Sequence, residues 1–227
     1  MNDTEFMRQA ERIGARISPD QMDRLRAYED HLWTWSERVR LVSRMDRDRL
    51  REHHLLESLS VVPHLPEYPL LALDLGTGGG LPGIPIKIAR PDIRIVLLEP
   101  ARMKALFLKS VLERLGLAGL EFVRARAEEI ASDGCHRGHY RIVLARGVAP
   151  LPALWDIAAP LLDASGRLFA LKGPGALAEF PQPLPSSLVF EERALPEIVP
   201  GRRRALIAMH RQHTPPGACG RSPSKTK

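Results

Sequence analysis

Hydrophobic positions follow two different periods along the chain. Over residues 22–39 they recur at roughly helical spacing, and "SPDQ" (18–21) before them is typical of a helix start with a capping box. A second helix is expected over 46–62, ended by Pro63. Residues 1–66 are therefore expected to form a helical extension.

From Leu70 onward, short apolar runs alternate with helical segments. The expected buried strands are 70–75, 93–99, 120–125, 141–145 and 167–172, and the expected helices between them are 83–90, 101–116 and 151–162. This alternation predicts parallel crossovers and a doubly wound sheet. Two later runs, 187–195 and 203–210, predict a closing pair of antiparallel strands. We expect a Rossmann-like α/β domain over 67–211 and a disordered basic tail over 212–227.

Composition narrows the class of partner. The 227 residues include 33 Lys and Arg against 27 Asp and Glu, a formal net charge of +6. This favours a polyanionic partner such as nucleic acid, although a solvated basic surface stays open as an alternative. No stretch reaches the roughly 18 apolar residues that span a bilayer, and the N-terminus lacks a signal-peptide core. The two cysteines, Cys135 and Cys219, lie far apart. We expect a cytoplasmic protein with neither a disulfide framework nor a membrane partner.

A glycine cluster follows the first expected strand. Asp74 lies near the end of that strand, two residues before "GTGGG" (76–80), and Glu99 ends the next strand. Ligands of doubly wound sheets bind beyond the carboxyl ends of the strands, where glycines let the backbone approach them. A carboxylate at position 99 can accept both hydroxyl hydrogens of a ribose. These features predict an adenosine-type cofactor.

Two such cofactors compete for this loop. "GGGLPG" (78–83) fits the dinucleotide fingerprint G-x-G-x-x-G. A pyrophosphate, however, needs backbone N–H donors at the start of the following helix, and Pro82 and Pro85 offer none. S-adenosylmethionine has no phosphate, and the D-x-G-x-G form of "DLGTG" (74–78) suits it. The loop therefore favours S-adenosylmethionine over NAD.

Several blocks of the sequence resemble one family. "DLGTGGGLPGIP" (74–85), "LLEPARMKALFLKSVLERLGL" (97–117), "ARAEEI" (125–130) and "VLARGVAPL" (143–151) are similar to motifs of the RsmG (GidB) family, the guanine-N7 methyltransferases of 16S ribosomal RNA. The resemblance implies a Rossmann-like S-adenosylmethionine-dependent methyltransferase fold with an N-terminal helical extension. It also implies methyl transfer to guanine 527 in rRNA numbering, on 16S rRNA or a small-subunit particle. We expect the protein to be a monomer.

The resemblance also implies site residues. Cofactor contacts are expected at Gly76, Leu81, Glu99, Ala127, Glu128 and Arg146. Arg146 is the one candidate for a catalytic role, because a charge at the mouth of a buried strand is costly without a purpose. The alternative for Arg146 is a salt bridge to Asp74 or Glu99, and Lys172 has a similar position. Guanine N7 carries a free lone pair, so the reaction needs no general base.

Other groups are assigned by type. We expect no metal site, and the adjacent His53 and His54 to face different sides of a helix. RNA phosphates are expected to contact a patch drawn from Arg38, Arg40, Arg44, Arg47, Arg51, Arg124, Arg126 and Arg202 to Arg204, and Trp33 or Trp35 could stack a base. Two other functions stay open, an NAD-type oxidoreductase and a non-catalytic RNA-binding protein.

Overall fold

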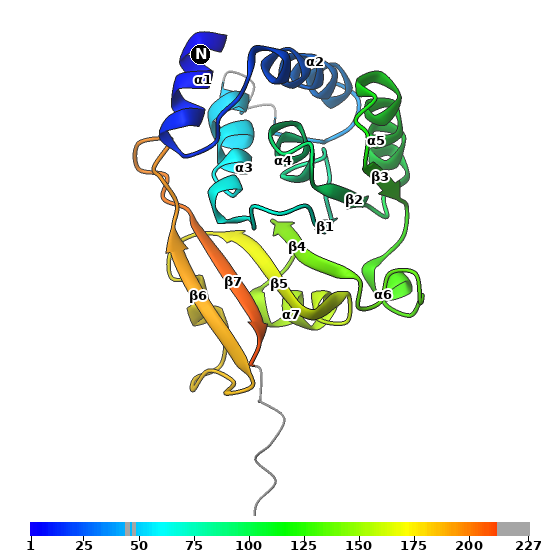
Figure 1. Ribbon diagram of the computed structural model, residues 1–227, viewed down its shortest axis with the longest axis vertical. Helices are drawn as coiled ribbons and strands as arrows, with labels where there is room; N and C mark the ends of the chain where they lie inside the picture. Colours follow the sequence, from blue (N-terminus) through cyan, green and yellow to red (C-terminus); the bar gives the residue numbers. More distant parts are fainter. Residues whose placement is uncertain (44–45, 47–48, 213–227) are drawn as a thin grey trace, which may run out of the picture.

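A seven-stranded sheet runs through the described part of the chain. The computed structural model describes residues 1–43, 46 and 49–212. The sheet has the order β3-β2-β1-β4-β5-β7-β6, in which β1 to β5 are parallel and β7 is antiparallel to both β5 and β6 (Figure 1). The strands are β1 Leu71–Leu75, β2 Arg94–Leu98, β3 Leu120–Val123, β4 Tyr140–Arg146, β5 Leu162–Lys172, β6 Leu188–Ala194 and β7 Ala205–Arg211.

Helices cover both faces of this sheet. They are α1 Asp3–Arg12, α2 Pro19–Ser36, α3 Glu57–Leu59, α4 Gly83–Ala89, α5 Arg102–Leu115, α6 Ala127–Ile130 and α7 Leu151–Ala158, with the short η2 Arg51–Leu56, η3 Val62–His64 and η4 Ala176–Glu179. Side chains of β1 alternate between the two faces: Ala72 packs with α4 and α5, and Leu73 and Leu75 pack with α6 and α7. Burial on both faces explains why the parallel strands are continuous apolar runs.

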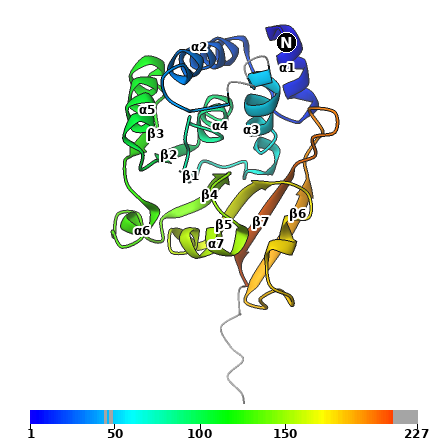
Figure 2. The ribbon, with the colours of Figure 1, turned by 180° about the vertical axis from the view of Figure 1, so that it is seen from behind.

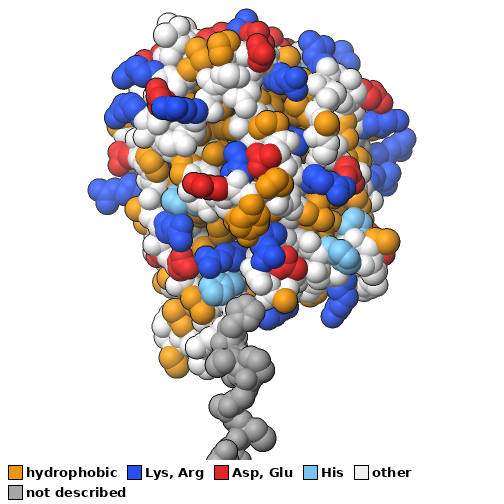
Figure 3. Space-filling view, in the orientation of Figure 1, with side chains coloured by type: hydrophobic (Ala, Val, Ile, Leu, Met, Phe, Trp, Pro, Cys, Tyr) orange, Lys and Arg blue, Asp and Glu red, His pale blue; other side chains and the backbone are white. Residues whose placement is uncertain are grey.

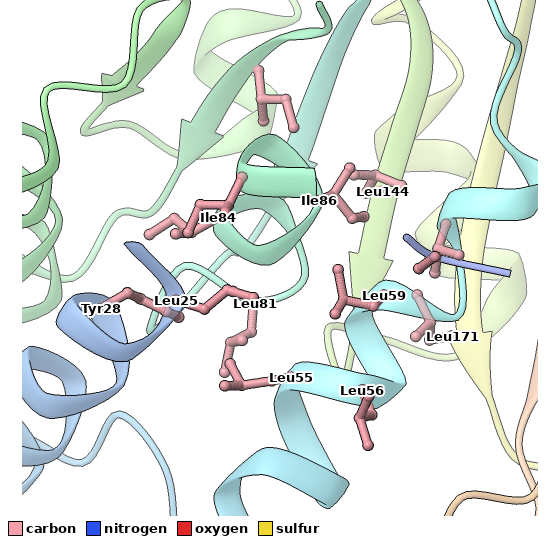
Figure 4. Packing of buried hydrophobic residues seen from close by; sticks show 14 of the residues in the cluster. Leu25, Tyr28, Leu55, Leu56, Leu59, Leu81, Ile84, Ile86, Leu144 and Leu171 are labelled. Atoms are coloured by element: carbon pink, nitrogen blue, oxygen red, sulfur yellow. The ribbon is translucent and has the colours of Figure 1, made fainter. Parts of the chain in front are cut away.

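The N-terminal extension shares its core with one face of the sheet. Leu25 and Tyr28 of α2 lie beside Leu81 and Ile84, and Leu55 of η2 approaches the same cluster (Figure 4). The helix start is as predicted: Ser18 and Gln21 form a capping box. Gln21 also donates a hydrogen bond from Nε2 to the Ile88 carbonyl in α4, at 2.8 Å. One continuous core thus includes residues from both predicted domains. The domain boundary predicted between residues 66 and 67 remains a proposal.

Several local predictions need correction. The single helix expected over 46–62 is a π-helical turn, η2, followed by the short α3 and the 3₁₀ turn η3. Pro63 lies inside η3 and does not end the helix, since a first-turn residue needs no N–H partner. Strand β5 takes the last residue of the helix expected over 151–162. Helix α1 was not predicted.

The closing strands are confirmed as the antiparallel pair β6 and β7, seen with the rest of the fold from behind in Figure 2. The expected tail lies outside the described residues, except for Gln212. Within the described ranges, no helix is both long and apolar enough to cross a membrane.

Candidate active site at the carboxyl ends of the strands

Asp74 fixes the loop between β1 and α4. Its side chain is fully buried, and Oδ2 accepts hydrogen bonds from the Gly83 N–H at 2.8 Å and from the Thr77 hydroxyl. The Thr77 N–H bonds to the Leu98 carbonyl in β2 at 3.1 Å. The predicted loop is thus tied to two neighbouring strands and to the start of α4.

Gly80 shows why the loop needs glycine. Its φ is +88°, and a Cβ at this position would stand 2.1 Å from Cδ1 of Ile84. No side chain fits in that space, and an L-residue would also be strained in this backbone conformation. The loop is therefore pressed directly against α4.

Glu99 lies against the glycine loop. Its side chain is buried, with Oε2 accepting from the Gly78 N–H and Oε1 from the Ala101 N–H, both at 3.0 Å. Lys104 Nζ stands 3.9 Å from Oε2. Each carboxylate oxygen has two lone pairs, so each retains one for a further donor. The acid is not directed at bulk water, and its predicted contact with a ribose remains a prediction.

The other cofactor candidates lie around this loop. Ala127 is buried at the start of α6, in the cluster that contains Leu75 and Leu98. Glu128 follows it and is exposed, while the neighbouring Glu129 bonds to the Arg126 N–H and caps the helix. Their contacts with adenine stay predictions.

Leu81 is placed differently from the other candidates. Its side chain is buried in the core beside Leu25 (Figure 4), and its N–H bonds to the Thr77 carbonyl at 3.0 Å. The contact predicted for Leu81 would therefore have to come from its remaining backbone atoms.

Arg146 ends β4 beside Asp74. It forms no ion pair with Asp74 or Glu99, contrary to the alternative drawn from the sequence. Burial lowers its pKa, and the nearby Glu57, Tyr28 and Asp74 oppose this shift. The structure thus places a mostly buried guanidinium at the carboxyl end of β4, paired with neither Asp74 nor Glu99. Lys172, by contrast, bonds to the Ala149 carbonyl at 2.8 Å and to Glu179, which is a structural role.

Asp74 has one buried oxygen without a partner. Its Oδ1 finds no hydrogen-bond donor in the described part of the chain. Burial raises the pKa of Asp74 from its ordinary 3.8 to about 6, although Thr77, the Gly83 N–H and Arg146 each lower it. An unpaired buried acceptor costs stability, so Oδ1 is the atom of Asp74 that is left to accept a further hydrogen bond.

One residue of the site was missed from the sequence. Tyr28 of α2 donates its hydroxyl hydrogen to the Gly79 carbonyl at 2.5 Å. Leu32 of the same helix and Leu41 also pack over Gly79. Tyr28 lies on the apolar stripe of its helix, where spacing alone does not separate a packed phenol from a positioning one.

The two histidines were wrongly expected to face different sides of a helix. His53 Nδ1 and His54 Nε2, in the π-helical turn η2, both contact the Asp46 carboxylate, at 2.8 and 3.2 Å. Arg202 bonds to His53 and, with Arg204, to Glu57. No group of three or more His, Cys, Asp or Glu among the described residues could hold a metal ion.

The predicted RNA patch is divided by these contacts. Arg51 is held by Glu29 and Asp3, so it is not free for phosphate, and Arg202 and Arg204 hold Glu57. Arg38, Arg40, Arg124, Arg126 and Arg203 are exposed or partly exposed, and Arg44 and Arg47 lie outside the described residues. Figure 3 shows Lys and Arg dispersed over this face among acidic side chains, with several along the edge beside α5. Trp35 packs with Phe107 at a ring distance of 5.8 Å, which favours a core role.

Solved structures with a similar fold include methyltransferases. A precorrin-6Y C5,15-methyltransferase from Geobacter metallireducens has a TM-score of 0.51, covering 68% of this chain and 87% of its own, at 15% identity. A protein from Corynebacterium glutamicum has a TM-score of 0.54, covering 83% and 91%, also at 15% identity. These likenesses concern the fold alone. They confirm the predicted class, a Rossmann-like methyltransferase fold, here with a helical N-terminal extension.

The sequence comparisons identify the family. The family described as rRNA small subunit methyltransferase G (GidB) matches residues 21–195. A Rubrobacter xylanophilus protein named Ribosomal RNA small subunit methyltransferase G is 36% identical to this chain, over 93% of this chain and 84% of the relative. A Halalkalibacterium halodurans protein of the same name is 32% identical, over 95% of this chain and 93% of the relative. The chain belongs to the rRNA small subunit methyltransferase G family, the one its motifs resemble. Nothing in these comparisons favours the NAD-type oxidoreductase.

Proposed function

We propose that this protein transfers a methyl group from S-adenosylmethionine to N7 of a guanine in 16S ribosomal RNA, guanine 527 in rRNA numbering. The family and the name of its relatives support an rRNA substrate. The base and the atom rest on the motifs quoted from the sequence. The observation that carries the proposal is a complementary pair at the strand ends, the unpartnered Oδ1 of Asp74 and the guanidinium of Arg146.

This pair fits the amino acid end of S-adenosylmethionine. An ammonium group pairs with a carboxylate, and Oδ1 of Asp74 has no donor among the described residues. A carboxylate needs a cation, and Arg146 is paired with neither Asp74 nor Glu99. Burial disfavours the ionised form of Asp74, and an adjacent ammonium would favour it again. Asp74 and Arg146 would thus hold the two charges of the amino acid.

The nucleoside end fits the neighbouring strand ends. Glu99 retains one lone pair on each oxygen for the two ribose hydroxyls. Ala127 and Glu128 follow β3, the next strand along the sheet, where a backbone N–H and a carboxylate can meet the adenine edge. Gly76 leaves the backbone bare between these groups.

The chemistry asks little of the protein beyond placement. S-adenosylmethionine supplies a methyl group activated by its sulfonium. The lone pair of guanine N7 would form a bond to the methyl carbon as the carbon–sulfur bond breaks, so that sulfur leaves as the neutral thioether S-adenosylhomocysteine and the positive charge passes to the guanine. Because no proton must be removed, both buried acids, Asp74 and Glu99, are available to hold backbone and cofactor. Holding the acceptor in line with the breaking bond supplies much of the acceleration.

Methyl transfer to isolated RNA tests this function. Small-subunit RNA from cells that lack the protein, both naked and in particles, is incubated with the protein and S-adenosylmethionine labelled in its methyl group. Nuclease digestion and mass spectrometry then locate the label. We expect one labelled guanine, modified at N7. Label on another base or atom would contradict the assignment, and no incorporation into either substrate would favour a non-catalytic RNA-binding protein.

A further inference from the structure

A hollow of about 980 Å³ lies beside the cofactor loop. It is lined by Ser36 at the end of α2, by residues 37, 38 and 40–43 that follow this helix, and by His54 of η2. In Figure 2 this segment runs back beneath α2 toward the cyan helical segment that contains α3. Sites for small ligands occupy about 300–1,000 Å³, so the hollow has room for one nucleotide.

Two of the lining residues connect the hollow to the candidate site. Leu41 lies over the glycine loop, since a Cβ added to Gly79 would stand 3.5 Å from Leu41 Cβ and 3.7 Å from its carbonyl oxygen. His54 lies close to Arg146, whose charge, after burial, lowers the histidine's pKa to about 4. Two residues of the lining, Leu41 and His54, therefore lie between the hollow and, respectively, the glycine loop and the carboxyl end of β4.

Two arginines at the edge of the hollow, Arg38 and Arg40, could bind phosphate groups. Arg38 and Arg40 are exposed, and neither forms an ion pair with an acid in the ranges that the structure describes. Arg26 and Arg51 of the same extension are instead held by Asp3. A guanidinium with free donors binds phosphate through two parallel hydrogen bonds. Among the described residues that line the hollow, Glu37 is the one acid.

We infer that this hollow receives the target nucleotide, extruded from the RNA, with neighbouring phosphates on Arg38 and Arg40 and the base directed past His54 toward Arg146. The inference rests on the proposed function and adds to it the route by which the acceptor enters. If the nucleoside of S-adenosylmethionine lies along Glu99 and Ala127, the guanine must approach the methyl group from the opposite side, where β4 and the N-terminal extension lie. A stacked base cannot reach so recessed a point, so it must be splayed out.

Salt dependence of RNA binding tests the two arginines without requiring turnover. Affinity for a small-subunit RNA fragment containing the target guanine is measured between low and physiological salt for the wild type, for Arg38→Ala/Arg40→Ala, and for the control Arg24→Ala. Arg24 is exposed on α2, away from the hollow. Each lost phosphate contact lowers the slope of log affinity against log salt by about 0.7–0.9. We expect this slope to be lower by about 1.4–1.8 in the double variant and unchanged in the control.

A filled hollow tests the entry of the nucleotide. Ser43→Trp places an indole at its exposed lip, and Ser165→Trp makes the same change at an exposed position outside its lining. We expect Ser43→Trp to lower kcat/KM for RNA about tenfold or more, with unchanged affinity for S-adenosylmethionine, and Ser165→Trp to keep both.

The outcomes separate this inference from the proposed function. An unchanged salt slope in the double variant, or unchanged kcat/KM in Ser43→Trp, overturns the inference while wild-type methylation upholds the function. Loss of S-adenosylmethionine affinity in these variants would also overturn it, since the hollow would then belong to the cofactor. Failure of the wild type to methylate any RNA refutes the proposed function, and the slope still reports whether the lip binds phosphate.

Discussion

Tyr28 donates a hydrogen bond to the Gly79 carbonyl, 2.5 Å away and 51 residues along the chain. Burial raises the pKa of this phenol well above its usual range, so the hydroxyl keeps its proton and remains a donor. The N-terminal extension thus positions the backbone of the glycine loop, 76–80, in addition to covering the sheet.

Tyr28→Phe tests this link. The ring keeps its packing, but a buried carbonyl loses its donor, which costs about 1–3 kcal/mol. We expect a lower free energy of unfolding in denaturant titration and weaker S-adenosylmethionine binding in calorimetry. Tyr68→Phe removes the same hydroxyl from a side chain that is 54% exposed and should change neither. Equal behaviour of the two variants would remove Tyr28 from the site.

Glu99→Gln tests the acid of β2. A glutamine has one acceptor oxygen, so it cannot serve both the Gly78 and the Ala101 N–H and still receive ribose. Hydrogen bonds to charged groups contribute about 1.5–3 kcal/mol, so S-adenosylmethionine affinity should fall about tenfold to a hundredfold. Glu121→Gln, at a side chain that is 55% exposed, is the matched control. Wild-type affinity in Glu99→Gln would mean that the ribose binds elsewhere.

Gly76→Val tests the bare backbone of the loop. Gly76 has a φ of +63°, and a Cβ there would stand 3.1 Å from Val148 Cγ2. The variant should lose measurable S-adenosylmethionine binding, because the side chain strains the loop and fills the space before the ligand. Gly134→Val, where a Cβ meets nothing within 4 Å, should bind normally. Normal binding by Gly76→Val would show that this loop is not the cofactor site.

Asp74→Asn tests the buried carboxylate through pH. The folded-state pKa of Asp74 is raised from 3.8 to about 6, so the folded protein binds this proton more tightly than the unfolded chain. The protonated Asp74 side chain therefore stabilises the folded state fully below about pH 4, and this stabilisation declines as the pH rises toward 6. Above that range, the ionised carboxylate makes the folded state roughly 3 kcal/mol less stable than a carboxylate with an unshifted pKa would. The stability of Asp74→Asn relative to wild type should therefore increase between pH 4 and 7, while S-adenosylmethionine binding falls. A difference that stays constant with pH would contradict the assigned ionisation.

Much of this architecture is predictable because local chemistry and tertiary packing agree. The strands of the parallel sheet are buried on both faces, so runs such as 70–75 and 141–145 stand out as continuous apolar segments. Asp74 and Glu99 were found because each ends such a run, and parallel strands bring their carboxyl ends to one edge of the sheet.

The remaining features depend on partners that no local pattern reveals. Helical spacing predicts that His53 and His54 face different sides of a helix, but both side chains contact Asp46. The sequence predicts Arg51 in the basic patch, but in the fold its side chain forms ion pairs with Glu29 and Asp3. Tyr28 lies on the apolar stripe of α2, so the sequence pattern predicts only packing for it. Its hydroxyl has a role because the fold brings it to the Gly79 carbonyl.

The most direct test of the account is a crystal structure with S-adenosylhomocysteine bound. We predict the ribose hydroxyls within hydrogen-bonding distance, about 2.5–3.2 Å, of Glu99, the amino group on Asp74 Oδ1 and the adenine beside Ala127. A nucleoside bound away from the loop between β1 and α4, or a ribose that leaves Glu99 untouched, would contradict it.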